Sequence, residues 1–187
     1  CKDAVCEYIW NGFEAGASKI CVALKGSPLE EAMSLVIEDD GVGIPYNNLD
    51  ETFGAFLSSV KNDSTIRIKS QMNKGKGRFS YLSFAPSAEW TTIYEENGER
   101  KKYIIKTDSS DRSQFDTSEP KIELFSERTG TSVEFPLIDN TTVNQLSYSS
   151  MKQKLLEEFA WYIYLNKDKD YCLDYLGNTL DVSQYIN

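Results

Sequence analysis

The chain has 187 residues, of which 40% are hydrophobic and 12% aromatic, as in a globular domain with one main core. No apolar run approaches the ~18 residues that a membrane span requires. Acidic side chains outnumber basic ones by 29 to 20, giving a net charge of −9. This balance disfavours a general nucleic-acid or anionic-membrane surface.

The four cysteines show no C-x-x-C spacing, and the chain has no histidine, so a zinc site is not expected. Free thiols are typical of a reducing compartment, which favours a cytoplasmic location. Residue 1 is a cysteine, and residues 2–13 already follow helical spacing. We therefore expect that the natural N-terminus is missing and that this domain is part of a larger protein.

Apolar residues at helical spacing predict a first helix over residues 2–17. Runs rich in β-forming residues predict strands over 20–24 and 34–37. Asn48 can cap a second helix that continues to about residue 57. Residues 58–76 are polar and charged without an apolar period, which indicates a loop.

A short helix is predicted over residues 78–84, before Pro86. Strands over 90–94 and 102–106 flank Asn97-Gly98, a strong hairpin signal. The remaining predicted elements are a Ser/Asp-rich connection over 108–120, strands over 122–125 and 131–135, a helix over 151–165, and a hairpin with strands over 171–175 and 180–182.

This order of elements predicts an α/β fold of the two-layer α+β sandwich type. One mixed, mostly antiparallel sheet would be covered on one face by the three longer helices. We expect a domain over residues 1–166. The hairpin in residues 167–187 either completes this domain or begins the next one.

Three motifs carry candidate chemistry, and the first is on the N-terminal helix. Glu7, Asn11 and Glu14 follow one another at helical spacing and share a face. A carboxylate and an amide on adjacent turns can act on one target. Polar residues at this spacing are more often a solvated helix face.

The second motif is VIEDDGVGIP, residues 36–45, in which Asp39 and Asp40 follow an apolar run. Gly41 and Gly43 permit positive φ angles and close approach of a ligand to the backbone. The simpler interpretation is an acidic turn, because Asp-Gly is ordinary turn chemistry.

The third motif is a positive segment over residues 61–78, which contains six cations and one anion in an acidic chain. It ends in Lys74-Gly-Lys-Gly-Arg78 and runs into a predicted helix. Glycine amides and a helix start can bind phosphate. The P-loop pattern is absent, and the alternative is a solvated basic loop.

The order of these motifs, followed by Gly130-Thr131 before a strand, resembles the GHKL ATPases. This family includes gyrase, heat-shock chaperone, histidine kinase and MutL proteins and has the Bergerat nucleotide-binding fold. The resemblance covers roughly residues 4–165, and EYIWNGFEAGA over residues 7–17 is most similar to the chaperone, MutL and microrchidia branches.

The resemblance implies ATP and Mg²⁺ as ligands. Glu7 would be the general base, Asn11 would coordinate Mg²⁺, and Asp39 would accept the hydrogen bond of the adenine amino group with help from Thr131 through a water. The other implied nucleotide-binding residues are Glu14, Gly41, Gly43, Lys74, Gly75, Lys76, Gly77 and Arg78. Two departures are Glu14, where many relatives have aspartate, and Met72, where a lid glycine is expected.

Three functions remain open on this basis. The first is an ATPase domain in which nucleotide-dependent closure of residues 58–77 changes contacts with other domains or a second subunit, as in an ATP-dependent dimer. The second is a nucleotide-dependent scaffold module that does not hydrolyse ATP. The third is a histidine-kinase catalytic domain, whose acceptor histidine would lie elsewhere because this chain has none.

Overall fold

The computed structural model describes residues 1–26, 33–49, 77–108, 111–126, 128–183 and 185, with only the backbone at 77–79 and 111–114. The chain begins with helix α1 (Lys2–Glu14), followed by strands β1 (Lys19–Lys25) and β2 (Met33–Asp39). Helix α1 ends three residues before the predicted boundary because the chain turns at Gly16, whose φ is +77°. The helix–strand–strand order is confirmed.

Short 3₁₀ helices lie at η1 (Tyr46–Asn48) and η3 (Gly77–Ser83), and the long antiparallel pair β3 (Ser87–Glu96) and β4 (Glu99–Asp108) follows η3. The hairpin turn is at Asn97-Gly98, where both residues have positive φ angles, as that dipeptide predicts. The helix expected over about 48–57 lies almost entirely outside the described residues.

Two predictions in the next segment are wrong. The Ser/Asp-rich connection contains a strand, β5 (Asp111–Thr117), which pairs with β4. The polar residues of this segment gave no strand signal. The segment forms a strand because it pairs with β4, and this pairing outweighs its low β propensity. The strand expected over 122–125 is only the two-residue β6 (Lys121–Ile122).

The last segment contains β7 (Gly130–Ile138), α3 (Asn140–Gln145), α4 (Tyr148–Leu165), η4 (Lys167–Lys169), β8 (Cys172–Tyr175) and β9 (Asn178–Thr179). Helix α3 was not predicted, although Asp139 caps it by accepting a hydrogen bond from the Thr142 N–H at 2.6 Å. The final hairpin turns at Leu176-Gly177, and its strand β9 ends before the predicted 180–182.

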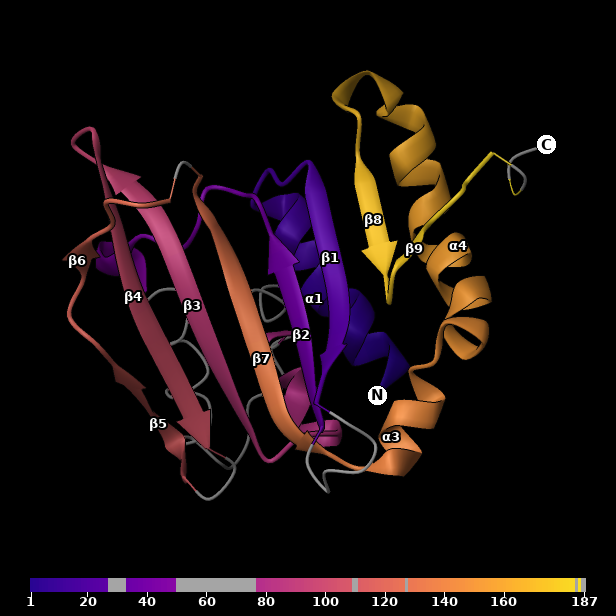
Figure 1. Ribbon diagram of the computed structural model, residues 1–187, viewed down its shortest axis with the longest axis horizontal. Coiled ribbons are helices and arrows are strands. Elements are labelled where there is room, and N and C mark those ends of the chain that lie inside the picture. Colours follow the sequence, from indigo (N-terminus) through magenta and orange to yellow (C-terminus); the bar gives the residue numbers. More distant parts are fainter. Residues whose placement is uncertain (27–32, 50–76, 109–110, 127, 184, 186–187) are drawn as a thin grey trace, which may run out of the picture.

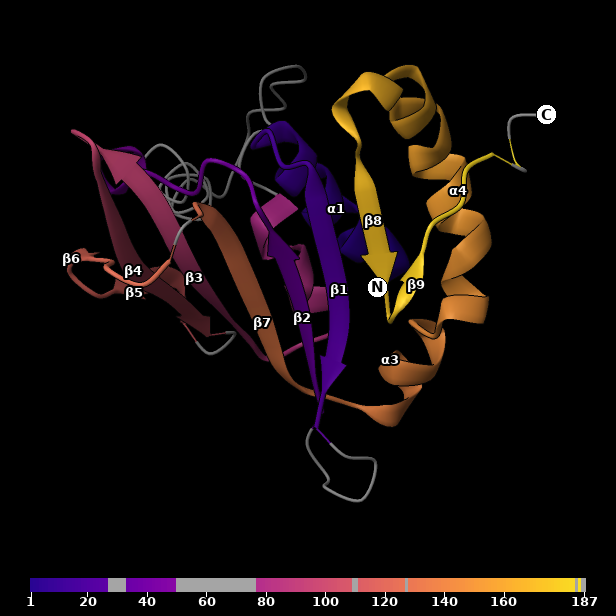
Figure 2. The same cartoon turned by 45° about the horizontal axis from the view of Figure 1, so that its top comes forward.

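The described strands form one sheet in the order β5-β4-β3-β7-β2-β1-β8-β9, with β6 also paired to β4. Neighbouring strands are antiparallel except β1 and β8, which are parallel. Helix α1 lies behind β1 and β2, and α4 flanks β8 and β9 (Figures 1 and 2). The predicted fold class, a mixed and mostly antiparallel sheet with helices on one face, is confirmed.

The core lies between the sheet and the two long helices. Ile9 and Phe13 of α1 are buried there together with Phe159 of α4. Aromatic contacts join the helices, since the ring centroids of Trp10 and Phe159 are 5.0 Å apart. In the part of the chain that the structure describes, no helix is long and apolar enough to cross a bilayer.

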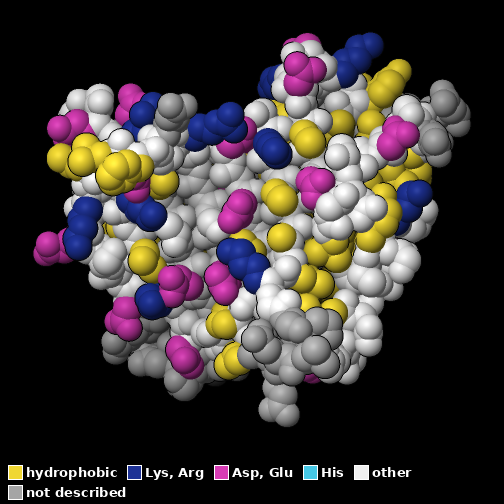
Figure 3. Space-filling model, viewed as in Figure 1, with side chains coloured by type: hydrophobic (Ala, Val, Ile, Leu, Met, Phe, Trp, Pro, Cys, Tyr) yellow, Lys and Arg dark blue, Asp and Glu magenta, His cyan; other side chains and the backbone are white. Residues whose placement is uncertain are grey.

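The other face of the sheet is polar. Glu89 and Lys106 pair across β3 and β4 at 2.7 Å, and charged side chains of both signs are scattered over this face in Figure 3. Hydrophobic side chains gather at and after β6, where Ile122, Leu124 and Phe125 are exposed. Asp39 lies on the opposite face, which α1 covers, since Gly12 of α1 packs against it.

Candidate nucleotide-binding site

A polar row crosses the inner face of the sheet. The strand register pairs Asp39 of β2 with Thr131 of β7, Thr131 with Thr92 of β3, and Thr92 with Tyr103 of β4. Thr92 and Tyr103 are buried, while Asp39 and Thr131 are partly exposed. Four residues that are far apart in the sequence are thus aligned by strand pairing.

The Asp39 carboxylate is at the cavity end of this row. The Gly41 N–H donates to its Oδ1 at 2.9 Å, and the Thr131 N–H faces the carboxylate from β7. Burial raises the pKa of Asp39 to about 6, against the lowering effect of these two N–H groups, and the neighbouring Asp40 charge raises it further. The remaining acceptor capacity of this carboxylate is available for a ligand.

Asp40, the second acid, has a different role. Its carboxylate accepts bonds from Ser18 N at 2.8 Å, Ser18 Oγ at 2.8 Å and Lys19 N at 2.7 Å. Partial burial opposes the effect, but these hydrogen bonds hold its pKa below the usual value. Asp40 fastens the end of β2 to the start of β1, so its role is structural.

The bend after the two acids is held by protein contacts. A Cβ at Gly41 would come within 2.7 Å of the Ala15 carbonyl oxygen. Gly43 has φ +74°, and a Cβ there would collide with the carbonyl oxygen of Ile93. The packing of the chain therefore requires glycine at both positions, whether or not a ligand binds beside them.

The backbone of Ile44 closes the bend onto the polar row. Its N–H donates to Thr92 Oγ1 at 2.9 Å, and its carbonyl accepts from the Tyr103 hydroxyl at 2.9 Å. Two neighbouring strands thereby fix one residue of the bend from both sides. The position of the bend relative to Asp39 and Thr131 follows from these bonds.

Helix α1 contributes Tyr8 and Asn11 to the cavity lining, and Ala15, the residue after the helix, also belongs to it. The Asn11 amide nitrogen is buried and has no hydrogen-bond partner among the described residues. Gly12 lets the helix approach the sheet, because a Cβ there would lie 2.9 Å from Ile20 and 3.1 Å from the Asp39 Cβ. A buried donor without a partner indicates a missing hydrogen-bond acceptor.

Asn11, Asp39 and Thr131 line one cavity of about 80 Å³ within the described part of the chain. The full lining is Tyr8, Asn11, Ala15, Ile37, Asp39, Gly43, Ile44, Trp90, Thr131 and Val133. Its walls are mostly apolar, with polar groups at a few points, as in small-molecule sites. The volume is below that of a complete ligand pocket, so the described walls form the floor of a site.

Not every predicted site residue reaches this cavity. Glu7 and Glu14 are exposed, and neither lines it. Residues 8, 11 and 15 line the cavity in place of the predicted 7, 11 and 14, so only Asn11 belongs to both sets. Lys74, Gly75 and Lys76 lie outside the described residues, and Gly77 and Arg78 begin η3.

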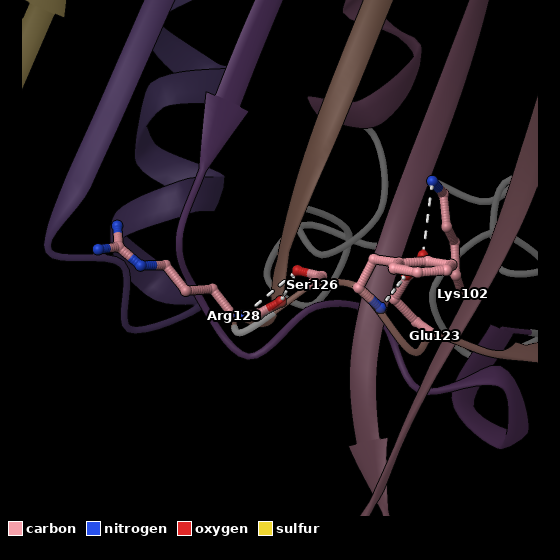
Figure 4. Close-up of polar contacts among 5 residues, drawn as sticks. Lys102, Glu123, Ser126 and Arg128 are labelled. Atoms are coloured by element: carbon pink, nitrogen blue, oxygen red, sulfur yellow. Dashed lines mark hydrogen bonds and ion pairs between the residues drawn. The ribbon is translucent and has the colours of Figure 1, made fainter.

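The connection from β6 to β7 delivers Gly130 and Thr131 to the site. Within this connection Ser126 Oγ donates to the Arg128 carbonyl at 2.8 Å, and its Glu123 pairs with Lys102 of β4 at 3.8 Å (Figure 4). Gly130 has φ +146°, and a side chain there would collide with the Asp39 carbonyl oxygen. The close approach of β7 to β2 at this point therefore requires glycine.

Sequence reasoning missed Tyr8, Trp90, Thr92 and Tyr103. For Thr92 a signal was present, since it lies between two aromatic residues on the apolar side of an alternating strand. A threonine at a buried position is almost always hydrogen-bonded, so a partner could have been anticipated. Which partner it has depends on the strand register.

The polar groups of Asn11 suit Mg²⁺ and a phosphate chain. Mg²⁺ prefers oxygen ligands and is commonly held by one or two protein groups together with substrate phosphates. Asn11 offers an amide oxygen, and its N–H₂, which has no partner within the described part of the chain, suits a phosphate oxygen or a bound water. Among the described residues no three Cys, Asp or Glu side chains form a metal cluster, so Asn11 fits a shared rather than a protein-only site.

These features coincide with one protein family. A family model described as "Histidine kinase-, DNA gyrase B-, and HSP90-like ATPase" matches residues 1–134, which is more than half of the chain. The chain therefore belongs to this family of ATPase domains, as the order of its motifs indicated. Membership implies that the domain binds ATP.

A stretch of 62 residues is 42% identical to the DNA mismatch repair protein MutL of Thermus aquaticus. The stretch is 33% of this chain and 11% of that protein. The similarity thus concerns a small part of MutL, and it supports the same family.

Proposed function

We propose that this domain binds Mg-ATP in the cavity between α1, the 41–44 bend and β7, and hydrolyses it slowly to drive conformational change in a larger protein. One observation carries the proposal. The largely buried carboxylate of Asp39 on β2 and the buried amide nitrogen of Asn11 on α1 line the same cavity, and that nitrogen has no hydrogen-bond partner among the described residues. The first suits the amino group of a base, and the second suits a phosphate.

At the base end, Asp39 would accept a hydrogen bond from the adenine amino group. The N–H of Gly41 holds the carboxylate in place before a ligand arrives, so little ordering is needed on binding. Thr131 lines the cavity beside Asp39 and would contact the base directly or through a water. The apolar side chains of Ile37 and Val133 would bury the ring.

At the phosphate end, Asn11 would hold Mg²⁺ through its amide oxygen. The ion, when bound, neutralises charge on the phosphates as one is transferred. Glu7 is one turn earlier on the exposed side of α1, where it would orient a water and accept its proton. Glu14 would reach the ion's shell through a water. The cationic segment that ends with Lys74–Arg78 would bind the phosphates, on the evidence of the sequence alone.

The larger protein is also part of the proposal. The similarity to MutL covers 11% of that protein, which accords with an ATPase domain working beside other domains. Nucleotide-dependent closure of residues 58–77 would change contacts with those domains or with a second subunit.

A binding module without hydrolysis is the second candidate, and one observation favours it. Glu7 is exposed and is not among the residues that line the cavity. A general base must come within hydrogen-bond reach of its water, directly or through one further water. If closure does not bring Glu7 there, the domain binds ATP and reports its presence without turnover.

Replacing Glu7 tests the proposal. We expect Glu7→Ala to lower phosphate release by about 10²-fold or more, while ATP still raises the melting temperature. The ligand-induced stabilisation should be about 2.7 kcal/mol at a hundredfold excess over Kd in both proteins. Phosphate release and thermal melting are the two measurements.

The matched control is Glu157→Ala, which removes an exposed helical glutamate from α4. It should change neither quantity. Equal phosphate release by the Glu7→Ala variant and the unaltered protein would contradict the role of Glu7. An ATP-dependent melting shift without any phosphate release would establish the binding module instead.

A further inference from the structure

Thr92 is completely buried and lies one position behind the cavity wall. It is not among the residues that line the cavity, but its cross-strand neighbour Thr131 is. Its hydroxyl oxygen is 3.1 Å from Thr131 Oγ1 and 3.3 Å from the Gly130 carbonyl oxygen. Thr92 can therefore act on a ligand only through the groups that it holds.

The hydrogen-bond capacity of this hydroxyl is small. It has one hydrogen to donate and two lone pairs to accept with. One lone pair is taken by the Ile44 N–H at 2.9 Å. The single hydrogen must be directed to Thr131 Oγ1 or to the Gly130 carbonyl, and the Thr131 oxygen is the nearer.

This choice decides what Thr131 presents to the cavity. If Thr92 donates to Thr131, the hydrogen of Thr131 is free to point into the cavity as a donor. If Thr131 donates to Thr92 instead, the cavity offers two acceptors side by side, the Thr131 lone pair and the Asp39 carboxylate.

The two polarities suit different purines. Adenine presents an amino donor next to a ring-nitrogen acceptor, which complements the Asp39 acceptor beside a Thr131 donor. Guanine presents a ring N–H next to an amino group, which complements two acceptors. A buried mismatch in such a pattern costs more than a lost bond, because it leaves polar groups without partners.

We propose that Thr92 is a positioning residue for purine selection: its hydroxyl donates to Thr131 Oγ1 and thereby fixes Thr131 as a donor toward the adenine ring. The inference rests on the proposed ATP site. Asp39 alone accepts from either purine, and the direction of the Thr92–Thr131 hydrogen bond restricts the site to adenine. The same hydroxyl holds Ile44, so the bend and the donor are set by one side chain.

The experiment compares ATP and GTP affinities, with Mg²⁺, in the unaltered protein and in Thr92→Val by titration calorimetry. Valine keeps the shape but removes the donor, so Thr131 can present either a hydrogen or a lone pair. We expect the preference for ATP over GTP to fall on the order of tenfold. Thr92→Ser, which restores the hydroxyl, should recover most of the preference.

Two controls separate positioning from general destabilisation. Thr107→Val removes another buried threonine hydroxyl, which donates to Tyr81 OH at 2.7 Å away from the cavity lining. It should lower the melting temperature and leave the nucleotide preference unchanged. Inorganic tripolyphosphate with Mg²⁺ has no base and should bind equally to the unaltered protein and to Thr92→Val.

An unchanged preference in Thr92→Val overturns the inference, and so does an equal loss of affinity for ATP, GTP and tripolyphosphate. If Thr92→Val does not melt cooperatively, Thr92→Cys is measured in its place. Its thiol donates weakly, so an intermediate preference is expected and an unchanged one is again contrary. Absence of any ATP binding by the unaltered protein would instead refute the proposed function.

Discussion

The two ends of the cavity are built in different ways. At the proposed base end, Asp39, Thr131 and Thr92 are aligned by strand pairing, and a hydrogen bond joins the two threonine hydroxyls. At the other end, Asn11 of α1 is buried without a partner for its amide nitrogen among the described residues, and Glu7 is exposed. The proposed base-binding end is therefore preorganised by the sheet, while the proposed phosphate-binding end has a buried amide nitrogen that a ligand would satisfy.

The largest expected effect comes from breaking the base end. Asp39→Asn places an amide donor where an acceptor is needed, so ATP affinity should fall on the order of 10²-fold. The fold should remain intact, because the amide retains the size of the carboxylate. Titration calorimetry with ATP measures the change, and thermal melting monitors the fold.

Its neighbour provides the control. Asp40→Asn weakens the bonds to Ser18 and Lys19, so it should lower the melting temperature and affect ATP affinity much less. Unaltered ATP affinity in Asp39→Asn would refute the assignment of the base end. Equal losses in both variants would show that the effect is structural.

A smaller effect is expected at the phosphate end. Asn11→Ala removes the proposed Mg²⁺ ligand, a loss of ~2 kcal/mol or about 30-fold in Mg-ATP affinity. Adenosine, which has no phosphates, should bind to this variant as to the unaltered protein. An equal loss for adenosine would mean that the two ends are not separable.

The smallest expected effect is pH dependence of adenosine binding. The pKa of Asp39 is raised from 3.8 to about 6, and only the carboxylate accepts from the amino group. Adenosine affinity should therefore rise about tenfold from pH 5 to pH 7, and it should be flat in Asp39→Asn. Adenosine is the suitable probe because it carries no phosphate that titrates in this range.

The raised pKa of Asp39 also makes the stability of the ligand-free protein depend on pH. Stability should fall as the pH rises, whereas adenosine affinity should increase. A carboxyl whose pKa is higher in the folded state contributes stability below its unfolded pKa near 3.8, and this contribution is lost as the pH rises through about 6. Unfolding measured from pH 4 to pH 7 should show this loss in the unaltered protein and lack it in Asp39→Asn. A loss of equal size in both proteins would assign the titration to another group.

Much of the fold was predictable because its signals are local. The apolar spacing of α1, the turn at Asn97-Gly98 and the alternation of β3 each lie within a short segment. Strand β5 was missed because its polar residues become a strand only by pairing with β4. Helix α3 was missed because it is six residues long, and only its cap at Asp139 indicates it.

The sequence by itself indicated the family and the fold class. It also indicated that Asn11 of α1 and the bend after Asp39 face one site. Only the tertiary structure decided that residues 8, 11 and 15 line the cavity, that Asp40 serves the backbone of β1, and that Thr92 stands behind Thr131. The physical reason is that local spacing fixes which residues share a face of one element. The register between strands, and the rotation of a helix against them, depend on packing among residues that are far apart in the chain.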